Sequence, residues 1–297
     1  MALKTIAEEL EFFFKSQQEF ISESYPGINF SRFKRDFCDF VAVNGLDGEE
    51  YLKQVYLGHK NHPLKKFTEK ILLKVPLQYI NQEAYFYQSS FFVNQNVLIP
   101  RSETEVLVEK ASQIIKQYFN SKPLFMWDVG TGSGAIFLSL LMEHPYAFKK
   151  VVASDVSSEA LNIAKKNFFL HEYRLPKKMS VEFICCDRLV DARGGIDLIV
   201  TNPPYIKRDA DMAGVHHQVH RYEPHLALYL SDANYDRWFE EFFSQIMQHL
   251  NPGGMCLMEG QSEHLQHLSH MALNLGFKKC DILLDLCGRE RFLQLLK

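Results

Sequence analysis

The sequence lacks long apolar segments and closely spaced cysteine pairs. No run of 18 apolar residues occurs in its 297 positions, so no membrane-spanning helix is expected. The six cysteines include no C-x-x-C pair, a pattern typical of reduced thiols in a cytosolic protein rather than of a disulfide framework. The first 20 residues contain four glutamates, whereas targeting peptides are poor in acids. The sequence therefore predicts a soluble cytoplasmic protein that does not enter a membrane.

An excess of charge of either sign is also missing. The 33 Lys and Arg residues nearly balance the 36 Asp and Glu residues, and the isoelectric point is about 6.5. This balance provides no overall attraction to a polyanion, so direct binding to nucleic acid is not expected. Apolar residues, by contrast, make up 46% of the chain, whose length exceeds that of most single domains. Two domains are expected, and no pattern indicates an oligomer.

Residues 1–80 are predicted to form a helical domain. Apolar side chains recur there at helical spacing, as in Leu10 and Phe14. Between residues 83 and 99, aromatic and β-branched runs alternate with turn-forming residues, which is typical of a β-hairpin. We interpret residues 81–101 as a hairpin connector to the rest of the chain.

Residues 102–297 are predicted to form an α/β domain. From residue 123 onward, strand patterns alternate with helical ones, which indicates an open, mostly parallel sheet of the Rossmann-like type. Ser102 is expected to cap the first helix. The expected strands are 124–129, 151–155, 181–185, 196–200, 255–258, 277–284 and 291–296, and the expected helices are 103–119, 135–143, 157 onward, 234–250 and 262–275.

A glycine turn, Gly130-Thr131-Gly132-Ser133-Gly134, follows the first of these strands. Glycine permits left-handed dihedrals and lets a ligand approach bare backbone. Asp128 precedes the turn, and Asp155 ends the next strand, where a carboxylate can accept hydrogen bonds from both hydroxyls of a ribose. The pattern predicts a site for a cofactor that contains a nucleoside.

The acidic surroundings favour S-adenosylmethionine over a dinucleotide. A pyrophosphate prefers a helix N-terminus with few nearby acids, whereas S-adenosylmethionine carries a sulfonium and an ammonium group that Asp128 would stabilise. Asp187 is placed to reach the adenine amino group, and Arg188 to pack over the ring. The dinucleotide interpretation stays open on these residues. The candidate cofactor-binding residues are Asp128, Gly130, Thr131, Gly132, Ser133, Gly134, Asp155, Asp187, Arg188 and Asn202.

The strand over 196–200 runs into Asn202-Pro203-Pro204-Tyr205. Proline has a fixed φ and no amide hydrogen, so the strand must stop and leave outward carbonyls. The Asn202 oxygen and the Pro203 carbonyl can bind the two hydrogens of a planar nitrogen and aim its lone pair at a methyl donor. Tyr205 can pack on the flat face of the target. We predict that these four residues are catalytic, with an amide or an adenine amine as the acceptor.

Together with other motifs, these residues resemble the release-factor glutamine methyltransferases, the PrmC/HemK family of class I methyltransferases. The resemblance is carried by residues 76–80, 98–105, 128–136, 202–206, 222–224 and 285–291. It implies methyl transfer from S-adenosylmethionine, with S-adenosylhomocysteine as product, to the glutamine side-chain amide in the Gly-Gly-Gln motif of peptide chain release factors. It also implies that the N-terminal helical domain helps to bind the release factor.

Two other functions remain open on the sequence. A DNA or RNA adenine N6-methyltransferase would use the same four residues but would need a basic groove. An inactive scaffold that binds S-adenosylmethionine would not need an intact Asn202. His216, His217, His220 and His225 resemble a metal cluster, but no step requires a metal, so we predict no metal site and a mobile polar loop there.

Overall fold

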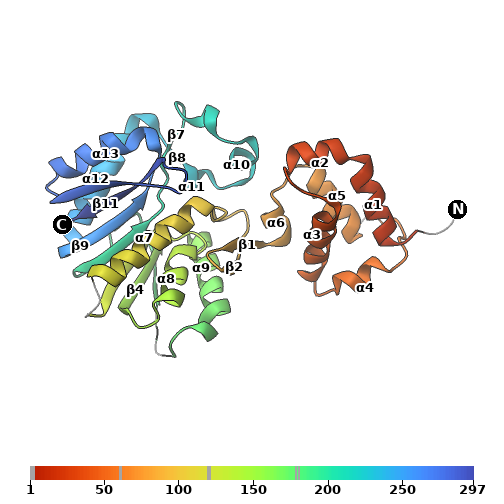
Figure 1. The fold of residues 1–297 in the computed structure, drawn as a ribbon, viewed down its shortest axis with the longest axis horizontal. Helices are drawn as coiled ribbons and strands as arrows, with labels where there is room; N and C mark the ends of the chain where they lie inside the picture. The colour runs from red at the N-terminus through yellow and green to blue at the C-terminus, as the bar shows by residue number, and fades with distance from the viewer. Residues whose placement is uncertain (1–3, 60–61, 119–121, 178, 180) are drawn as a thin grey trace. The chain divides into compact units, whose positions relative to one another are not determined.

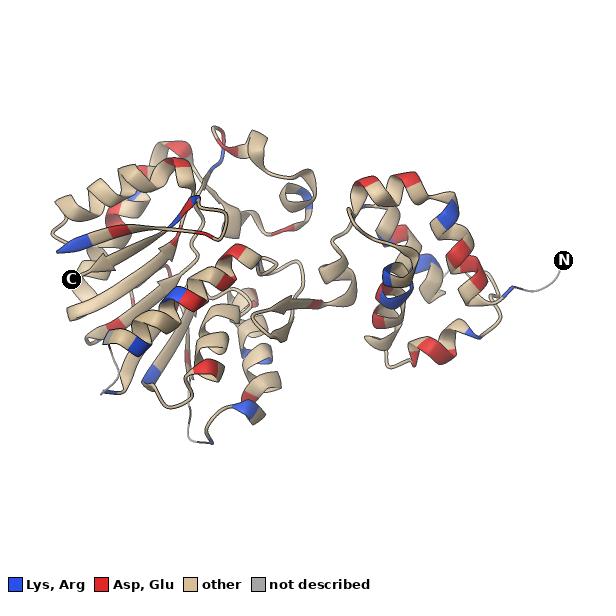
Figure 2. Ribbon diagram, in the orientation of Figure 1, with Lys and Arg blue, Asp and Glu red and all other residues tan. Residues whose placement is uncertain are grey.

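The computed structural model describes residues 4–59, 62–118, 122–177, 179 and 181–297 (Figure 1). By its internal contacts the chain divides into two compact units, Met1–Glu83 and Ala84–Lys297. Figure 2 shows acidic and basic residues interspersed along the helices of both units. Within the described residues, no helix combines the length and the apolar character that crossing a membrane requires.

The first unit is helical, as the apolar spacing predicts. Its core is built from aromatic rings, with Phe67 lying 5.3 Å from both Phe33 and Phe37 between ring centroids. Thr5 caps the first helix, because its side chain accepts the Glu8 amide and Glu8 accepts the Thr5 amide in return. The helices are α1 (Ile6–Ser16), α2 (Gln18–Ser24), α3 (Phe30–Ala42), α4 (Gly48–Leu52), α5 (Pro63–Leu72) and the unanticipated α6 (Leu77–Asn81).

A two-stranded hairpin, β1 (Glu83–Phe86) and β2 (Ser89–Phe92), confirms the hairpin expected near residue 83. Tyr87 and Gln88 form its turn with positive φ angles of 44° and 64°. Asn167 anchors the hairpin by accepting the Phe92 amide at 2.7 Å and donating to the Phe92 carbonyl at 2.9 Å. The apolar run at 97–99 does not form a strand.

The second unit contains a seven-stranded sheet in the order β10-β11-β9-β6-β3-β4-β5. The strand β11 pairs antiparallel with β10 and with β9, and the other four pairs of this sheet are parallel, which confirms the open, mostly parallel α/β fold. The strands are β3 (Leu124–Val129), β4 (Phe148–Asp155), β5 (Val181–Cys185), β6 (Ile196–Thr201), β9 (Leu250–Glu259), β10 (Lys279–Leu284) and β11 (Glu290–Leu296). The principal helices are α7 (Ser102–Tyr118), α8 (Ala135–Glu143), α9 (Ser158–His171), α12 (Tyr235–His249) and α13 (Ser262–Asn274).

Alternating side chains of the central strand β3 divide the core into two clusters. Leu124 and Met126 pack in the cluster that includes α7 and α8, whereas Phe125 and Trp127 pack in the cluster that includes α12 and α13. This follows from the period of two along a strand. Both faces of the sheet are therefore covered, and a strand buried on both sides reads as a continuous apolar run.

Three local expectations differ from the structure. The helix α7 begins at Ser102, which is therefore its first residue rather than a residue preceding it. The strand β9 begins at Leu250, five residues before the strand expected over 255–258. The predicted loop at 207–225 contains regular structure, because its ends are held by a short parallel pair. The remaining elements are β7 (Ile206–Lys207), α10 (His217–Tyr222), α11 (His225–Leu228), β8 (Tyr229–Leu230) and the 3₁₀ turns Glu172–Arg174, Met212–Gly214 and Asp232–Asn234.

Candidate active site

A cavity of about 260 Å³ opens at the carboxyl ends of the central parallel strands. The strands β3, β4 and β6 end together there, since Val129 pairs with both Ser154 and Thr201. Ligands of such sheets bind at this edge. Of the predicted residues, Gly130, Thr131, Gly132, Ser133, Asp155, Asp187, Arg188, Asn202, Pro203 and Pro204 line the cavity. Asp128, Gly134 and Tyr205 are not among its lining residues.

The glycine turn adopts a left-handed backbone conformation that favours glycine. Gly130, Gly132 and Gly134 have φ angles of 69°, 55° and 82°, values that side chains with a Cβ rarely adopt. A Cβ on Gly134 would lie 2.8 Å from Phe137 and would crowd α9 at Ala164. Gly134 therefore allows α8 to begin and to pack closely, while the first two glycines leave bare backbone facing the cavity.

Asp128 lies beneath this turn and is completely buried. Its Oδ2 accepts a hydrogen bond of 2.7 Å from the Thr131 hydroxyl, and its Oδ1 has no partner among the described residues. Burial raises the pKa of Asp128 to about 7. Thr131 lines the cavity, so the carboxyl group of Asp128 is separated from the cavity by one side chain.

Asp155 faces the cavity at the end of β4. Its carboxylate is fixed by two backbone amides, Gly132 to Oδ2 and Ser157 to Oδ1, each at 2.9 Å. Burial raises the pKa of Asp155. Each oxygen retains a second lone pair, so the fixed carboxylate can still accept hydrogen bonds from two vicinal hydroxyls. The bare glycine backbone, this carboxylate and the orphaned oxygen of Asp128 together fit S-adenosylmethionine.

Replacing Asp155 with asparagine is expected to weaken S-adenosylmethionine binding about tenfold, as measured by titration calorimetry. The asparagine amide would point one N–H at the Gly132 or Ser157 amide and would accept from only one hydroxyl. Glu159→Gln, an exposed change on the first turn of α9, is the matched control. Equal affinity of the Asp155 variant and the parent would show that this carboxylate does not hold the cofactor.

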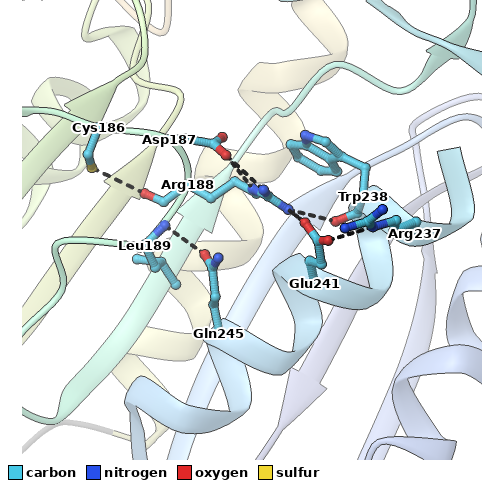
Figure 3. A network of polar contacts seen from close by, with 8 residues as sticks. All are labelled: Cys186, Asp187, Arg188, Leu189, Arg237, Trp238, Glu241 and Gln245. Carbon is cyan, nitrogen blue, oxygen red and sulfur yellow. Dashed lines mark hydrogen bonds and ion pairs between the residues drawn. The ribbon is translucent and has the colours of Figure 1, made fainter. Parts of the chain in front are cut away.

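Arg188 is fixed by a polar network that the sequence did not reveal (Figure 3). Its guanidinium donates to Asp187 at 2.7 Å, to Glu241 at 3.1 Å and to the Trp238 carbonyl at 3.2 Å. The guanidinium carbon lies 5.2 Å from the Trp238 ring centroid, and the neighbouring Leu189 amide donates to Gln245. Arg188 and Trp238 thus present planar groups on one wall of the cavity. That Arg188 packs over adenine remains a prediction.

The predicted Asn-Pro-Pro-Tyr segment follows β6 directly, and Asn202 projects its amide into a defined hydrogen bond. Its Nδ2 donates to the Thr104 hydroxyl at 3.1 Å. The Tyr205 hydroxyl donates to Glu259 at 3.1 Å. The stacking of Tyr205 on a target group also remains a prediction. Burial raises the pKa of Tyr205, and the nearby Glu259 carboxylate raises it further.

Two pairs of residues complete the site without having been predicted as functional. Arg101 and Glu223 form an ion pair of 2.6 Å, and Glu223, which is 1% exposed, also accepts the Ile99 amide. This pair joins the connector to the segment that follows α10. Both residues belong to sequence motifs that carried the family resemblance, but their pairing had no signal in the sequence. Thr104 and Glu259 are joined by a hydrogen bond of 2.7 Å.

The histidine-rich segment, residues 216–225, and its neighbours are held by side-chain contacts. His220 lies 3.0 Å from the Tyr229 hydroxyl, and its ring stacks on that of His225 with centroids 4.8 Å apart. His264 lies 2.9 Å from Asp211, which also accepts the Lys207 amide. Across the part of the chain that the structure describes, no group of three or more His, Cys, Asp or Glu side chains is placed to hold a metal ion.

Solved structures share the fold of this chain. The hMettl16 catalytic domain, in a complex with the MAT2A 3'UTR hairpin 6, aligns with a TM-score of 0.53 at 17% identity over 82% of this chain and 84% of that one. The 16S rRNA N2 G1207 methyltransferase (RsmC) of T. thermophilus, in complex with AdoMet and guanosine, aligns with a TM-score of 0.50 at 15% identity over 72% and 49%. The chain therefore has the fold of these proteins.

Sequence comparison narrows this fold to one family. The methyltransferase small domain family matches residues 104–226. Release factor glutamine methyltransferases of Flavobacterium psychrophilum and Leptospira interrogans are 34% and 36% identical, over 76% and 78% of this chain and 78% and 79% of their own length. That of Bacillus anthracis is 30% identical over 86% of this chain and 88% of its own. The chain belongs to the release factor glutamine methyltransferase family.

Proposed function

We propose that this protein transfers a methyl group from S-adenosylmethionine to the side-chain amide nitrogen, N5, of the glutamine in the Gly-Gly-Gln motif of peptide chain release factors. The observation that carries the proposal is the orientation of Asn202. Its Nδ2 is committed to Thr104, which leaves Oδ1 to accept a hydrogen bond from an incoming amide. The names of the relatives supply the release factor as the amide's source.

The chain contributes positioning and charge stabilisation. A glutamine amide nitrogen is a poor nucleophile, because its lone pair is delocalised into the carbonyl. Accepting its two hydrogens at Asn202 Oδ1 and the Pro203 carbonyl orients the nitrogen and stabilises the positive charge that develops on it. When bound, S-adenosylmethionine supplies the methyl group from its sulfonium and leaves as S-adenosylhomocysteine. The nitrogen finally loses one proton to solvent, which restores a neutral amide.

We further infer how the parts of the chain share this task. The helical residues 1–80 contribute to recognition of the release factor, residues 81–101 connect, and residues 102–297 bind the cofactor and the target glutamine. The histidine-rich segment is tied to the connector by the Arg101–Glu223 pair, in which Arg101 lines the cavity and Glu223 directly precedes the lining residue Pro224. Because the substrate is a translation factor, the proposed reaction takes place in the cytoplasm.

The test uses S-adenosylmethionine labelled in its methyl group. We expect label in a purified release factor, none in its Gly-Gly-Gln to Gly-Gly-Ala variant, and none in duplex DNA or structured RNA. Equal label in the release factor and in its variant would contradict the glutamine assignment. Label in DNA or RNA would identify a nucleobase methyltransferase, and no label in any substrate would identify a binding scaffold.

A further inference from the structure

A chain of hydrogen bonds runs from the cavity into the protein behind Asn202. Asn202 Nδ2 donates to Thr104 Oγ1 at 3.1 Å, and Thr104 Oγ1 donates to Glu259 Oε2 at 2.7 Å. The other oxygen of Glu259 accepts the Tyr205 hydroxyl at 3.1 Å. The participants come from α7, from the end of β9 and from the segment after β6, so the chain joins three separate elements of the fold.

The Glu259 carboxylate determines which groups donate and which accept in this chain of hydrogen bonds. Glu259 is 1% exposed and ends β9, next to Phe292 of the neighbouring strand β11. Burial raises its pKa, whereas the Thr104 hydroxyl, the positive charge of Arg291 and the Tyr205 hydroxyl oppose that shift. An ionised carboxylate can only accept hydrogen bonds. In this form Glu259 accepts from both hydroxyls, Thr104 at Oε2 and Tyr205 at Oε1, as the structure shows.

The direction in which the Thr104 hydroxyl donates fixes the orientation of the Asn202 side-chain amide at the cavity. Thr104 has one hydroxyl proton, and once it is given to Glu259 the Thr104 oxygen can only accept from Asn202. Asn202 must then present its NH₂ group to Thr104 and its Oδ1 elsewhere. The reverse orientation would place an N–H donor against the N–H groups of an incoming amide, where no hydrogen bond can form.

We propose that Glu259 is a positioning residue for methyl transfer, which acts through Thr104 to hold the Asn202 amide with its oxygen toward the acceptor nitrogen. This role rests on the proposed function for its effect on turnover. The amide orientation itself is a property of the ligand-free protein and can be measured without a substrate.

Three variants alter this chain of hydrogen bonds at different points. Glu259→Gln supplies an N–H in place of one acceptor, which allows Thr104 to donate toward Asn202 and the Asn202 amide to rotate. Thr104→Val removes the link, and Thr104→Ser retains the hydroxyl. We expect the first two to lower kcat about 10- to 100-fold, since small misplacements of a positioning group have effects of this size. Thr104→Ser should stay within about threefold of the parent, on the same ground.

A purely structural role of Glu259 would change the melting temperature or the dissociation constant of S-adenosylmethionine together with kcat. A positioning role predicts a different result. The dissociation constant of S-adenosylmethionine and the melting temperature should stay close to those of the parent, while kcat falls. The double variant Thr104→Val/Glu259→Gln should be no slower than the slower single variant, because the two residues act in series. Glu143→Gln is the matched control: Glu143 also accepts two hydroxyls, but their residues, Ser112 and Tyr87, do not line the cavity, whereas Thr104 does.

The orientation is measured separately from activity by the Asn202 side-chain amide resonances in ¹⁵N-correlated NMR spectra. In the parent, one N–H of Asn202 should be protected from solvent exchange by Thr104, and this protection should disappear in Thr104→Val and change in Glu259→Gln. An unchanged kcat in Glu259→Gln, additive losses in the double variant, or identical Asn202 resonances in all variants would each overturn the proposal. If the parent fails to methylate a release factor but shows the expected resonances, the proposed substrate is wrong and the role of Glu259 in orienting Asn202 stands.

Discussion

Replacing Asn202 with alanine is expected to lower kcat about 10²- to 10³-fold, the range observed when one preorganised polar group is removed from a reaction centre. Alanine cannot accept a hydrogen bond from the target nitrogen, so both the aim of its lone pair and part of the stabilisation of its growing charge are lost. We expect the glycine turn and Asp155 to hold most of the cofactor, so its dissociation constant should change by less than about threefold. Single-turnover kinetics and calorimetry measure these two quantities.

A control variant separates this effect from general damage. Asn274→Ala makes the same chemical change at an exposed residue that ends α13 and should match the parent in both measurements. If Asn202→Ala weakened cofactor binding as much as it slowed turnover, the main role of Asn202 would be in the cofactor site. If turnover were unaffected, the acceptor nitrogen would have to bind elsewhere.

The second large effect concerns the stability of the protein as a function of pH. Burial raises the pKa of Asp128 from 3.8 to about 7 in the folded chain. Between these values the folded protein retains a proton that the unfolded chain has lost, so the free energy of unfolding falls as pH rises. The difference in pKa corresponds to about 4 kcal/mol of stability, which is fully present below about pH 4 and is lost as the pH rises through about 7.

Asp128→Asn removes this titration while leaving an oxygen to accept the Thr131 hydroxyl. The variant should therefore gain stability over the parent, in the absence of cofactor, by roughly 3 kcal/mol more at pH 8 than at pH 5. Urea denaturation at both pH values measures the difference. Asp281→Asn on β10, which removes a carboxylate 2.6 Å from Lys279, should show no such change. A constant difference between parent and Asp128→Asn at the two pH values would mean that Asp128 titrates normally.

The elements of the sheet domain were predictable because their patterns are local. The turn at 130–134 follows from glycines that tolerate positive φ, and the stop after Thr201 follows from two prolines that cannot donate to a sheet. Once the strands were recognised as parallel, their carboxyl ends had to meet, which brought Asp155 and Asn202 to one cavity. These steps need no knowledge of packing.

The start of β9 was predicted wrongly, because it depends on a contact between strands rather than on a local pattern. Pro252 and two glycines read as a turn, but the segment pairs with β6 from Leu250 onward, across a register shift between Ile196 and Leu198. A close approach of backbones explains the composition, because a Cβ on Gly254 would lie 3.0 Å from the Ile196 carbonyl. Glycine here serves the contact between two strands, and that contact is not visible in the local pattern.

The order of the glycine turn, the acidic strand ends and the Asn-Pro-Pro-Tyr segment was enough to favour a methyltransferase that acts on a planar nitrogen. The side-chain partners came from packing. Thr104 and Glu259 are separated by 155 positions, and Asn202 and Thr104 by 98. Such pairs depend on how α7 lies against the sheet and on where β9 ends, and neither is encoded in the neighbourhood of any one residue. The sequence by itself therefore indicated the chemistry of the glycine turn, the acidic strand ends and the Asn-Pro-Pro-Tyr segment. The direction in which the Asn202 amide points is determined by the hydrogen-bond network of the folded protein.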